Sequence, residues 1–214
     1  MFRLRSAMVS PDPDTLIPPP ARGMRADARR NLEAVIEAAR RLMSTQGLDA
    51  QMDDIASAAG VGVGTVYRHF PTKDDLIVAL AEHRFQRLAE LATEALAEDD
   101  PGPAFERFLF RGAELQASDR ALSEVMRERP DAMRAGATRA GLLELVRALL
   151  TRAQEAGAIR PDAVAEDIPM LMCGLGTSTP SCEGPFITPA SWQRFLTIIV
   201  DGLRAGAASE MPPR

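Results

Sequence analysis

The chain has few of the residue types on which metal, redox and phosphate-loop chemistry depend. Its 214 residues include only two cysteines, two histidines and one lysine. Cys173 and Cys182 form neither a disulfide framework nor a zinc site, which favours a reducing, cytoplasmic location. His69 and His83 have no clustered cysteine or acidic partner, and the only lysine, Lys73, lies in no phosphate loop. We therefore expect no bound metal and no cofactor.

Long apolar runs are also missing. No apolar stretch approaches the roughly 18 residues that span a bilayer, and no hydrophobic signal region follows Arg3 and Arg5. Apolar residues make up 46% and charged residues 26%, a balance that excludes a fibrous or wholly disordered chain. Gly60–Gly64 partly matches a nucleotide-binding loop, but Thr65 occupies the position of its third glycine and no strand precedes it. Because long apolar runs are missing, we expect no membrane association. Because no set of catalytic residues stands out, we also expect no enzymatic activity.

The acidic excess of the chain is unevenly distributed. The net charge is −5, yet residues 1–76 carry ten basic and ten acidic side chains, whereas the remainder carries fifteen and twenty. Arg22, Arg25, Arg29 and Arg30 form a basic cluster ahead of the first helical pattern. This asymmetry is typical of a small nucleic-acid-binding unit on an acidic body. The alternative is a disordered tail that happens to contain arginines.

Helical periodicity accounts for most of the chain, so the predicted class is all-α. Residues 1–23 hold five prolines and few apolar side chains, which predicts a flexible arm whose arginines are candidates for minor-groove contact. We expect a three-helix unit over residues 24–76, a larger helical domain over 77–207 and a tail over 208–214. Apolar stripes predict helices at about residues 27–47, 52–59, 63–70, 74–97, 105–115, 122–126, 142–157, 168–175 and 192–200, with a loop from Gly174 to Pro189.

Two of these helices form the most informative pattern. They are short, a tight glycine turn joins them, and the second carries polar and aromatic residues off its buried stripe. These are the properties of a helix-turn-helix motif, here residues 51–70, whose second helix enters the major groove of DNA. Residues 49–76 resemble the N-terminal signature of TetR-type bacterial transcriptional regulators, because the Gly-Val turn, the Thr-x-Tyr, the aromatic before proline and the following lysine occur together. The resemblance covers about residues 28–76.

The resemblance implies a DNA-binding role for particular residues. Thr65 matches a position on the DNA side of the reading helix, Tyr67 and Lys73 match phosphate contacts, and His69 matches a groove-side or phosphate-contacting position. Side-chain readout is reduced where Gly62 and Gly64 stand, which leaves Val63 an apolar contact. Arg68 is then the best candidate for a bidentate guanine contact, and a phosphate contact is its alternative; Tyr67 could instead be a half-buried core residue. The full set of expected DNA contacts is Gln51, Gly62, Val63, Gly64, Thr65, Tyr67, Arg68, His69 and Lys73.

The larger domain is expected to serve dimerisation, since paired helix-turn-helix units bind two half-sites about one helical turn apart. The family resemblance places the dimer contact on the last two helices. The candidate dimer residues are Ile168, Leu171, Leu175, Trp192, Phe195, Leu196 and Ile199. The alternative is that these stripes pack only onto the core of their own chain.

The same domain contains adaptable apolar side chains that could line a ligand cavity. The candidate pocket residues are Phe85, Phe105, Phe108, Met126, Met133, Met170 and Met172, with plain core packing as the alternative. The resemblance implies a homodimeric repressor of operator DNA that a small apolar or amphipathic inducer releases, with the helix from Asp74 to Ala97 as the lever. A regulator that answers to a protein partner or to its own abundance is the alternative.

Overall fold

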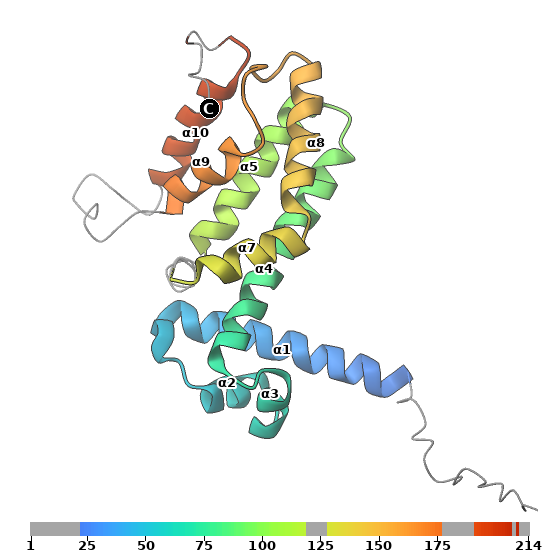
Figure 1. Ribbon diagram of the computed structural model, residues 1–214, viewed down its shortest axis with the longest axis vertical. Helices are drawn as coiled ribbons and strands as arrows, with labels where there is room; N and C mark the ends of the chain where they lie inside the picture. Colours follow the sequence, from blue (N-terminus) through green and yellow to red (C-terminus); the bar gives the residue numbers. More distant parts are fainter. Residues whose placement is uncertain (1–21, 119–127, 177–190, 207–208, 210–214) are drawn as a thin grey trace, which may run out of the picture.

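The protein is a bundle of helices in which a small N-terminal group lies at one end of the molecule (Figure 1). The structure is a computed structural model, and it describes residues 22–118, 128–176, 191–206 and 209. Within these residues there are no strands, only an isolated bridge between Ile159 and Arg204, so the all-α prediction is confirmed. The elements are α1 (Arg22–Gln46), the 3₁₀ turn η2 (Gly47–Asp49), α2 (Met52–Ala59), α3 (Val63–His69), α4 (Lys73–Leu96), α5 (Pro101–Ser118), α7 (Pro130–Arg139), α8 (Leu142–Glu155), α9 (Asp167–Gly176) and α10 (Ser191–Leu203).

Local sequence signals explain the ends of the short N-terminal helices. Gly60 ends α2 with a φ of 68°, a left-handed conformation that glycine adopts without a side-chain clash. Thr72 caps α4: its hydroxyl accepts the amide of Asp75 at 3.1 Å, and the Asp75 carboxylate accepts the amide of Thr72 at 3.0 Å. This reciprocal capping box fixes where α4 begins, directly after the helix-turn-helix motif.

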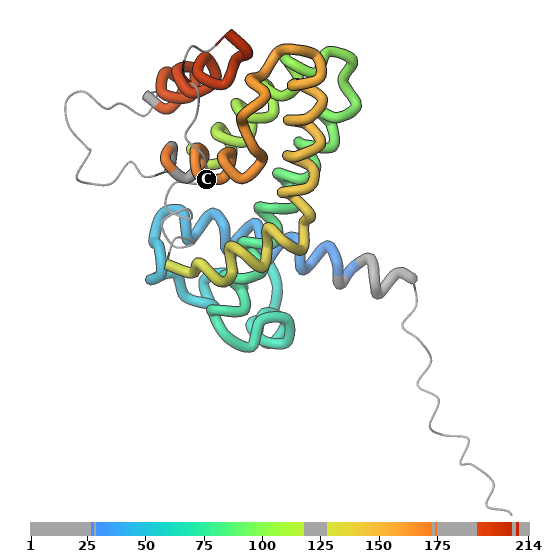
Figure 2. The backbone as a smooth tube through the Cα atoms, turned by 45° about the horizontal axis from the view of Figure 1, so that its top comes forward, coloured from blue at the N-terminus to red at the C-terminus, as the bar shows by residue number. Residues whose placement is uncertain are grey.

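The buried apolar side chains form two clusters, which α4 joins. We call α1–α3 with the N-terminal half of α4 the head. The first cluster lies in the head and comprises Val35, Ile36, Ala38, Ala39, Met43, Ala50, Met52, Ile55, Ala56, Val66, Phe70, Leu76, Ile77, Leu80, Ala81 and, from α7, Ala132. The second cluster begins at Leu91 on the same helix and is built with α5, α8, α9 and α10. Figures 1 and 2 show α4 rising from the head into this second group.

The structure corrects three expectations about helix boundaries. The first helix begins at Arg22 rather than near residue 27, so it includes the last two residues assigned to the arm. The second correction is α7, which periodicity did not single out because its residues are mostly polar or small. The third is α9, which continues to Gly176 and so takes in the start of the expected loop. The helix expected at 122–126, the remaining loop and residues 1–21 lie outside the described residues.

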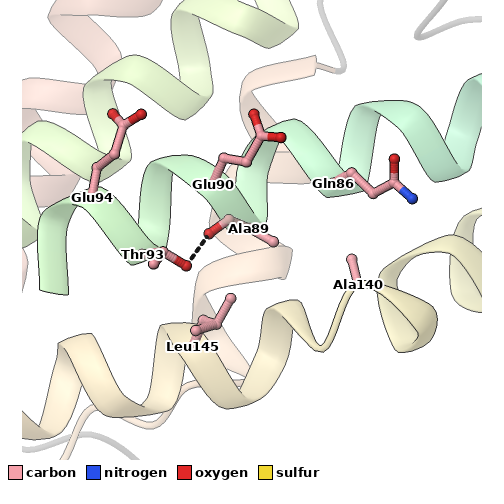
Figure 3. Close-up of a pocket in the computed structure, with 7 residues that line it drawn as sticks. All are labelled: Gln86, Ala89, Glu90, Thr93, Glu94, Ala140 and Leu145. Carbon is pink, nitrogen blue, oxygen red and sulfur yellow. Dashed lines mark hydrogen bonds between the residues drawn. The ribbon is translucent and has the colours of Figure 1, made fainter. Parts of the chain in front are cut away.

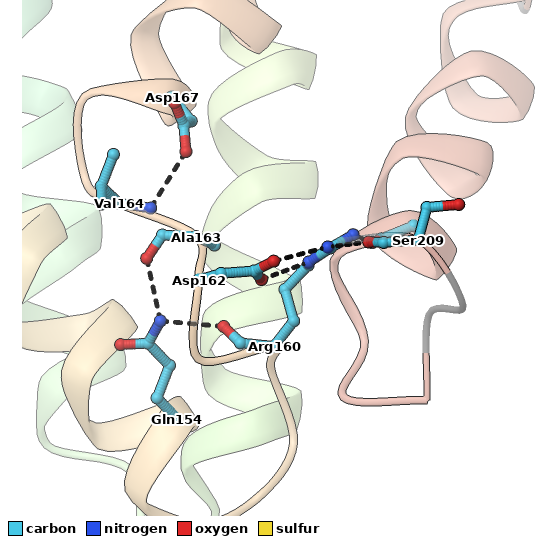
Figure 4. Close-up of polar contacts among 8 residues, drawn as sticks. Gln154, Arg160, Asp162, Ala163, Val164, Asp167 and Ser209 are labelled. Atoms are coloured by element: carbon cyan, nitrogen blue, oxygen red, sulfur yellow. Dashed lines mark hydrogen bonds and ion pairs between the residues drawn. The ribbon is translucent and has the colours of Figure 1, made fainter. Parts of the chain in front are cut away.

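A cluster of hydrogen bonds around Arg160 attaches α10 to the segment after α8 (Figure 4). Arg160 donates to both carboxylate oxygens of Asp162, at 2.6 and 2.7 Å, and to the Gly202 carbonyl at 3.3 Å. The hydrogen bonds that the Arg160 guanidinium donates to Asp162 raise the pKa of Arg160 above its ordinary value. Gln154 donates to the carbonyls of Arg160 and Ala163, both at 2.9 Å. These hydrogen bonds therefore hold one face of α10 against the core and leave its opposite face outward.

Candidate nucleic-acid interface

The reading helix α3 turns one side inward and presents the other to solvent. Val66 is fully buried and Phe70 is 6% exposed, so both pack into the first cluster. Each residue turns an α-helix by about 100°, which places Gly64 and Arg68 nearly opposite Val66. Thr65 and Tyr67 flank them. We call these four residues the reading face.

The side chains of the reading face are available for contact with another molecule. Tyr67 is 46% exposed and belongs to neither apolar cluster, which argues against a core role. Arg68 is exposed and makes no ion pair or hydrogen bond within the described part of the chain. Val63 is 40% exposed at the start of the helix. A free guanidinium beside a phenol hydroxyl is a donor set suited to phosphate or base edges.

The two glycines of this region are not required by the packing of the protein. A Cβ atom built on Gly62 or on Gly64 has no neighbour within 4 Å. Gly62 has an ordinary φ of −67° at the N-cap of α3, and Gly64 is helical. A glycine in a helix costs about 0.5–1 kcal/mol relative to alanine, so the fold alone would favour a side chain at Gly64. The space in front of the helix backbone is left open for something outside the chain.

Two other expected DNA contacts, Lys73 and Gln51, donate hydrogen bonds within the described chain, and a third, His69, does not. The Lys73 ammonium donates to the Leu48 carbonyl, which ties the start of α4 to the 3₁₀ turn. Because an ammonium has three donors, this bond leaves Lys73 others for a phosphate. Gln51 donates to the Asp49 carbonyl at 2.7 Å. His69 is half-buried, and its Nε2 atom is buried without a hydrogen-bond partner among the described residues.

The expected pocket residues that the structure describes belong to different parts of the helical bundle. Phe105 and Phe108 lie in the filled second cluster, and Met133 packs against the first. Met170 is 74% exposed on the outer side of α9, and Met126 lies outside the described residues. Phe85 lies near α7 and Met172 near α5, where each approaches a helical glycine. Phe105 and Phe108 are buried in the second cluster, as core packing predicts, and the shared pocket stays a prediction.

A different hollow lies along the outer side of α4 (Figure 3). It is a groove of about 560 Å³ with an apolar floor, and it opens to solvent. Leu145 and Ala140 approach α4 across it, whereas the carboxylates of Glu90 and Glu94 point away from Leu145. Arg87 pairs with Glu90 at 2.8 Å. The lining residues are Gln86, Ala89, Glu90, Thr93, Glu94, Ala140 and Leu145, none of which the sequence pattern identified.

The expected dimer residues divide by burial. Ile168 and Leu196 are 3% and 1% exposed, so they pack in the core of the single chain, and their part in a dimer contact stays a prediction. Leu171, Trp192 and Ile199 are half-buried against that core. The side chain of Leu175 is not among those that the structure describes. Phe195 is 47% exposed.

Two exposed apolar residues on α9 and α10 were not among the expected dimer residues. Ile198 is 64% exposed on α10, and Met170 is 74% exposed on α9, which contacts α10. Helical spacing alone could have identified Ile198 as exposed, because it lies on the opposite side of α10 from the buried Leu196. We call Met170, Phe195 and Ile198 the α9–α10 face.

An exposed, cation-bearing helix after a glycine turn defines the chain as a helix-turn-helix protein, and comparison with known proteins identifies its family. The model described as bacterial regulatory proteins of the tetR family matches residues 35–80, and that described as the SbtR-like transcriptional regulator C-terminal domain matches residues 100–205. The chain belongs to the TetR family. It is a DNA-binding transcriptional regulator, and the family is not one of enzymes, as expected.

Individual relatives agree with this assignment. A TetR transcription regulatory protein from Mycobacterium vanbaalenii is 36% identical, with 85% of this chain and 99% of that chain covered and a TM-score of 0.64. A TetR regulator from Streptomyces coelicolor is 29% identical over 82% of this chain and 99% of that one, with a TM-score of 0.62. The FadR regulator from Bacillus subtilis, solved with stearoyl-CoA, is 20% identical over 80% and 99%, with a TM-score of 0.61, and shows the fold alone.

Similarity to a curated relative covers a short part of each chain. An HTH-type transcriptional regulator from Staphylococcus aureus is 43% identical over 54 residues, which cover 25% of this chain and 29% of that protein. In the described part of the chain, no helix combines the length and apolarity needed to cross a membrane.

Proposed function

We propose that the protein is a homodimeric repressor that reads operator DNA through α3 and leaves it when a small ligand binds. The observation that carries the proposal is the reading face: Arg68 and Tyr67 stand outward, without partners in the described chain, beside an open glycine surface. A major groove admits one helix of this width.

The expected contacts then divide into two kinds. Arg68 and Thr65 read base edges, and Val63 offers an apolar contact to a thymine methyl. Tyr67, Lys73 and the positive end of α4 hold phosphates, His69 takes a groove-side or phosphate-contacting position, and Gln51 supports the backbone at Asp49. Gly62 and Gly64 let the helix backbone approach the groove closely.

Two copies pair through the α9–α10 face. Met170, Phe195 and Ile198 have exposed fractions of 74%, 47% and 64%, and apolar side chains exposed together favour burial against a partner. A symmetric contact uses the same face on both copies. It would hold two reading helices at a fixed separation of about 34–36 Å, the spacing of successive major grooves.

The ligand is proposed to be apolar or amphipathic. Neighbouring folds include fatty-acid regulators, one solved with stearoyl-CoA, which supports this class. The groove along α4 that Leu145 lines is the candidate entry for the ligand, because its floor is apolar and α4 runs from it to the DNA-binding end. The close packing of Phe105 and Phe108 favours the second candidate, a regulator without a small-molecule inducer.

Selection of bound DNA from a random pool tests the proposal. We expect an inverted repeat with half-site centres about one helical turn apart, bound by two copies of the chain. Selection of single half-sites by a monomer would refute the dimer. Adding fatty acids or acyl-CoA at fixed salt should release the selected DNA and raise the melting temperature of the free protein. Unchanged operator affinity would favour the second candidate.

A further inference from the structure

Helix α7 belongs to the first apolar cluster although it lies far along the chain. Ala132 is 8% exposed within that cluster, and Met133 packs against it. Every other member comes from residues 32–81, so within the described residues α7 alone completes the head from outside it. A Cβ atom on Gly136 would lie 3.2 Å from the Ala81 backbone, which shows how closely α7 approaches α4.

Two ion pairs connect the ends of α7 to α4. At one end Arg139 pairs with Glu82, near the middle of α4. At the other end the Arg129 guanidinium donates to Asp74 at 2.7 Å, across 55 residues of sequence. Asp74 lies in the first turn of α4, next to Lys73. The close helix packing between the two pairs sets Arg129 at the DNA end of α4.

The position of Asp74 creates an electrostatic conflict that Arg129 resolves. Lys73 and the positive end of α4 favour a phosphate, but the Asp74 carboxylate beside them repels one. Asp74 is 69% exposed, so solvent screens its charge only in part at the distance of one residue. Arg129 is the cation on this carboxylate, and its Nε atom is buried without a partner in the described chain. Among the described residues, the polar contact of the Arg129 side chain is therefore its ion pair with Asp74.

We propose that Arg129 strengthens operator binding by neutralising Asp74 beside the phosphate contact of Lys73. This inference rests on the proposed DNA interface. Arg129 is a positioning residue that need not touch DNA. A unit charge left uncompensated near a phosphate at a partly screened surface changes affinity by roughly three- to tenfold.

Operator affinity of four variants tests the inference at fixed, low salt. Arg129→Gln should weaken binding roughly three- to tenfold, and Arg129→Lys should stay within about twofold of the parent because it keeps the charge. Asp74→Asn should bind as tightly as the parent or more tightly. The double variant Arg129→Gln with Asp74→Asn should recover the affinity of Asp74→Asn, because the carboxylate that Arg129 neutralises is then absent.

Arg139→Gln is the matched control, since it removes an α4–α7 ion pair far from Lys73. It should leave operator affinity unchanged, whereas the deficit of Arg129→Gln should shrink as salt rises. An unweakened Arg129→Gln, or a double variant that stays weak, would overturn the inference; weak binding of Arg139→Gln would indicate a general packing effect instead and also overturn it.

The Lys73→Ala variant distinguishes a failure of the inference about Arg129 from a failure of the proposed DNA interface. If Lys73→Ala binds the operator as well as the parent, the phosphate contact itself is wrong and the inference falls with it. If Lys73→Ala binds weakly while Arg129→Gln does not, only the role of Arg129 is refuted. Should Arg129→Gln fold poorly, tighter or equal binding by Asp74→Asn still supports the inference, and weaker binding refutes it.

Discussion

The reading face and the α9–α10 face both leave groups without partners, but the groups differ. On α3 the outward positions are Gly64 and Arg68, a bare backbone next to a free cation. On α9 and α10 they are Met170, Phe195 and Ile198, all apolar and 47–74% exposed. A polyanion suits the first surface, whereas a second apolar surface suits the other.

The arginines near the two surfaces differ in their internal partners. Beside α10, Arg160 is held by Asp162 at 2.6 Å and Arg204 by Glu106 at 3.1 Å, so these charges are already compensated. Arg68 has no such carboxylate in the described chain. An arginine without an internal partner is available to an external one, and Arg194 on α10 is a second such arginine in the described chain, so the contrast between the two surfaces rests on their glycine and apolar positions.

The largest expected effect comes from adding charge to the α9–α10 face. Ile198→Glu should give a folded monomer, because the side chain is 64% exposed in the single chain and the carboxylate meets its own copy across a symmetric contact. Losing the second half-site should weaken operator binding on the order of a hundredfold or more. Light scattering and DNA titration measure both results. Gln193→Glu adds the same charge on the flank of α10 and should remain a dimer; a dimeric Ile198→Glu variant would move the interface elsewhere.

The next effect tests the reading face. Arg68→Ala should cost roughly 1–3 kcal/mol of binding free energy on the preferred operator and much less on operators changed at the guanine it reads. Affinities over a panel of operator variants give the comparison, with Arg68→Lys as the variant that keeps charge but loses the bidentate geometry. Uniform weakening over all operators would make Arg68 a phosphate anchor.

The head could be predicted from the sequence because its signals are local. Gly60, Pro71 and the capping pair Thr72 and Asp75 each fix a helix end within a few residues, and the buried stripe through Val66 then determines which side of α3 faces out. The family signature covered the same segment. Long-range packing was not needed for either inference.

The body could be predicted only in class. Periodicity identified apolar faces, but Ile168, Leu196 and Phe105 are buried against helices that the sequence does not place in space. Ile198 and Met170 follow the same spacing rules and yet remain exposed. The role of α7 was missed because small residues let it pack closely against α4, and a small residue leaves no apolar stripe to detect.

A smaller effect is expected where the reading face has no side chain. Gly64→Ala should stabilise the free protein by about 0.5–1 kcal/mol, because a Cβ there meets nothing within 4 Å and alanine favours helix. The same methyl should weaken operator binding by roughly 1 kcal/mol if the helix backbone lies close to DNA. Gly112→Ala in α5, where a Cβ makes ordinary contact with Leu88 at 3.4 Å, is the control that should leave DNA binding unchanged. Unimpaired binding by Gly64→Ala would mean that the backbone does not approach the groove.

The smallest effect concerns a cation of the head that does have an internal partner. Arg40 donates to Glu37 at 2.8 and 2.9 Å, and these hydrogen bonds lower the pKa of Glu37 below its ordinary value of 4.5. A depressed carboxyl pKa stabilises the fold above the unfolded pKa, and this contribution is lost as pH falls through the folded value. Since Glu37 is 47% exposed, Glu37→Gln should cost at most about 0.5 kcal/mol at pH 7, less as the pH drops below 4.5.

Denaturant unfolding at several pH values, with operator titration at pH 7, measures both consequences. Glu33→Gln on the same helix, whose pair with Arg29 is longer at 3.6 Å, should change stability less. A loss of stability that does not vary with pH would point to packing rather than charge. If Glu37→Gln altered operator affinity as strongly as Arg68→Ala, paired and unpaired arginines would be equivalent toward DNA.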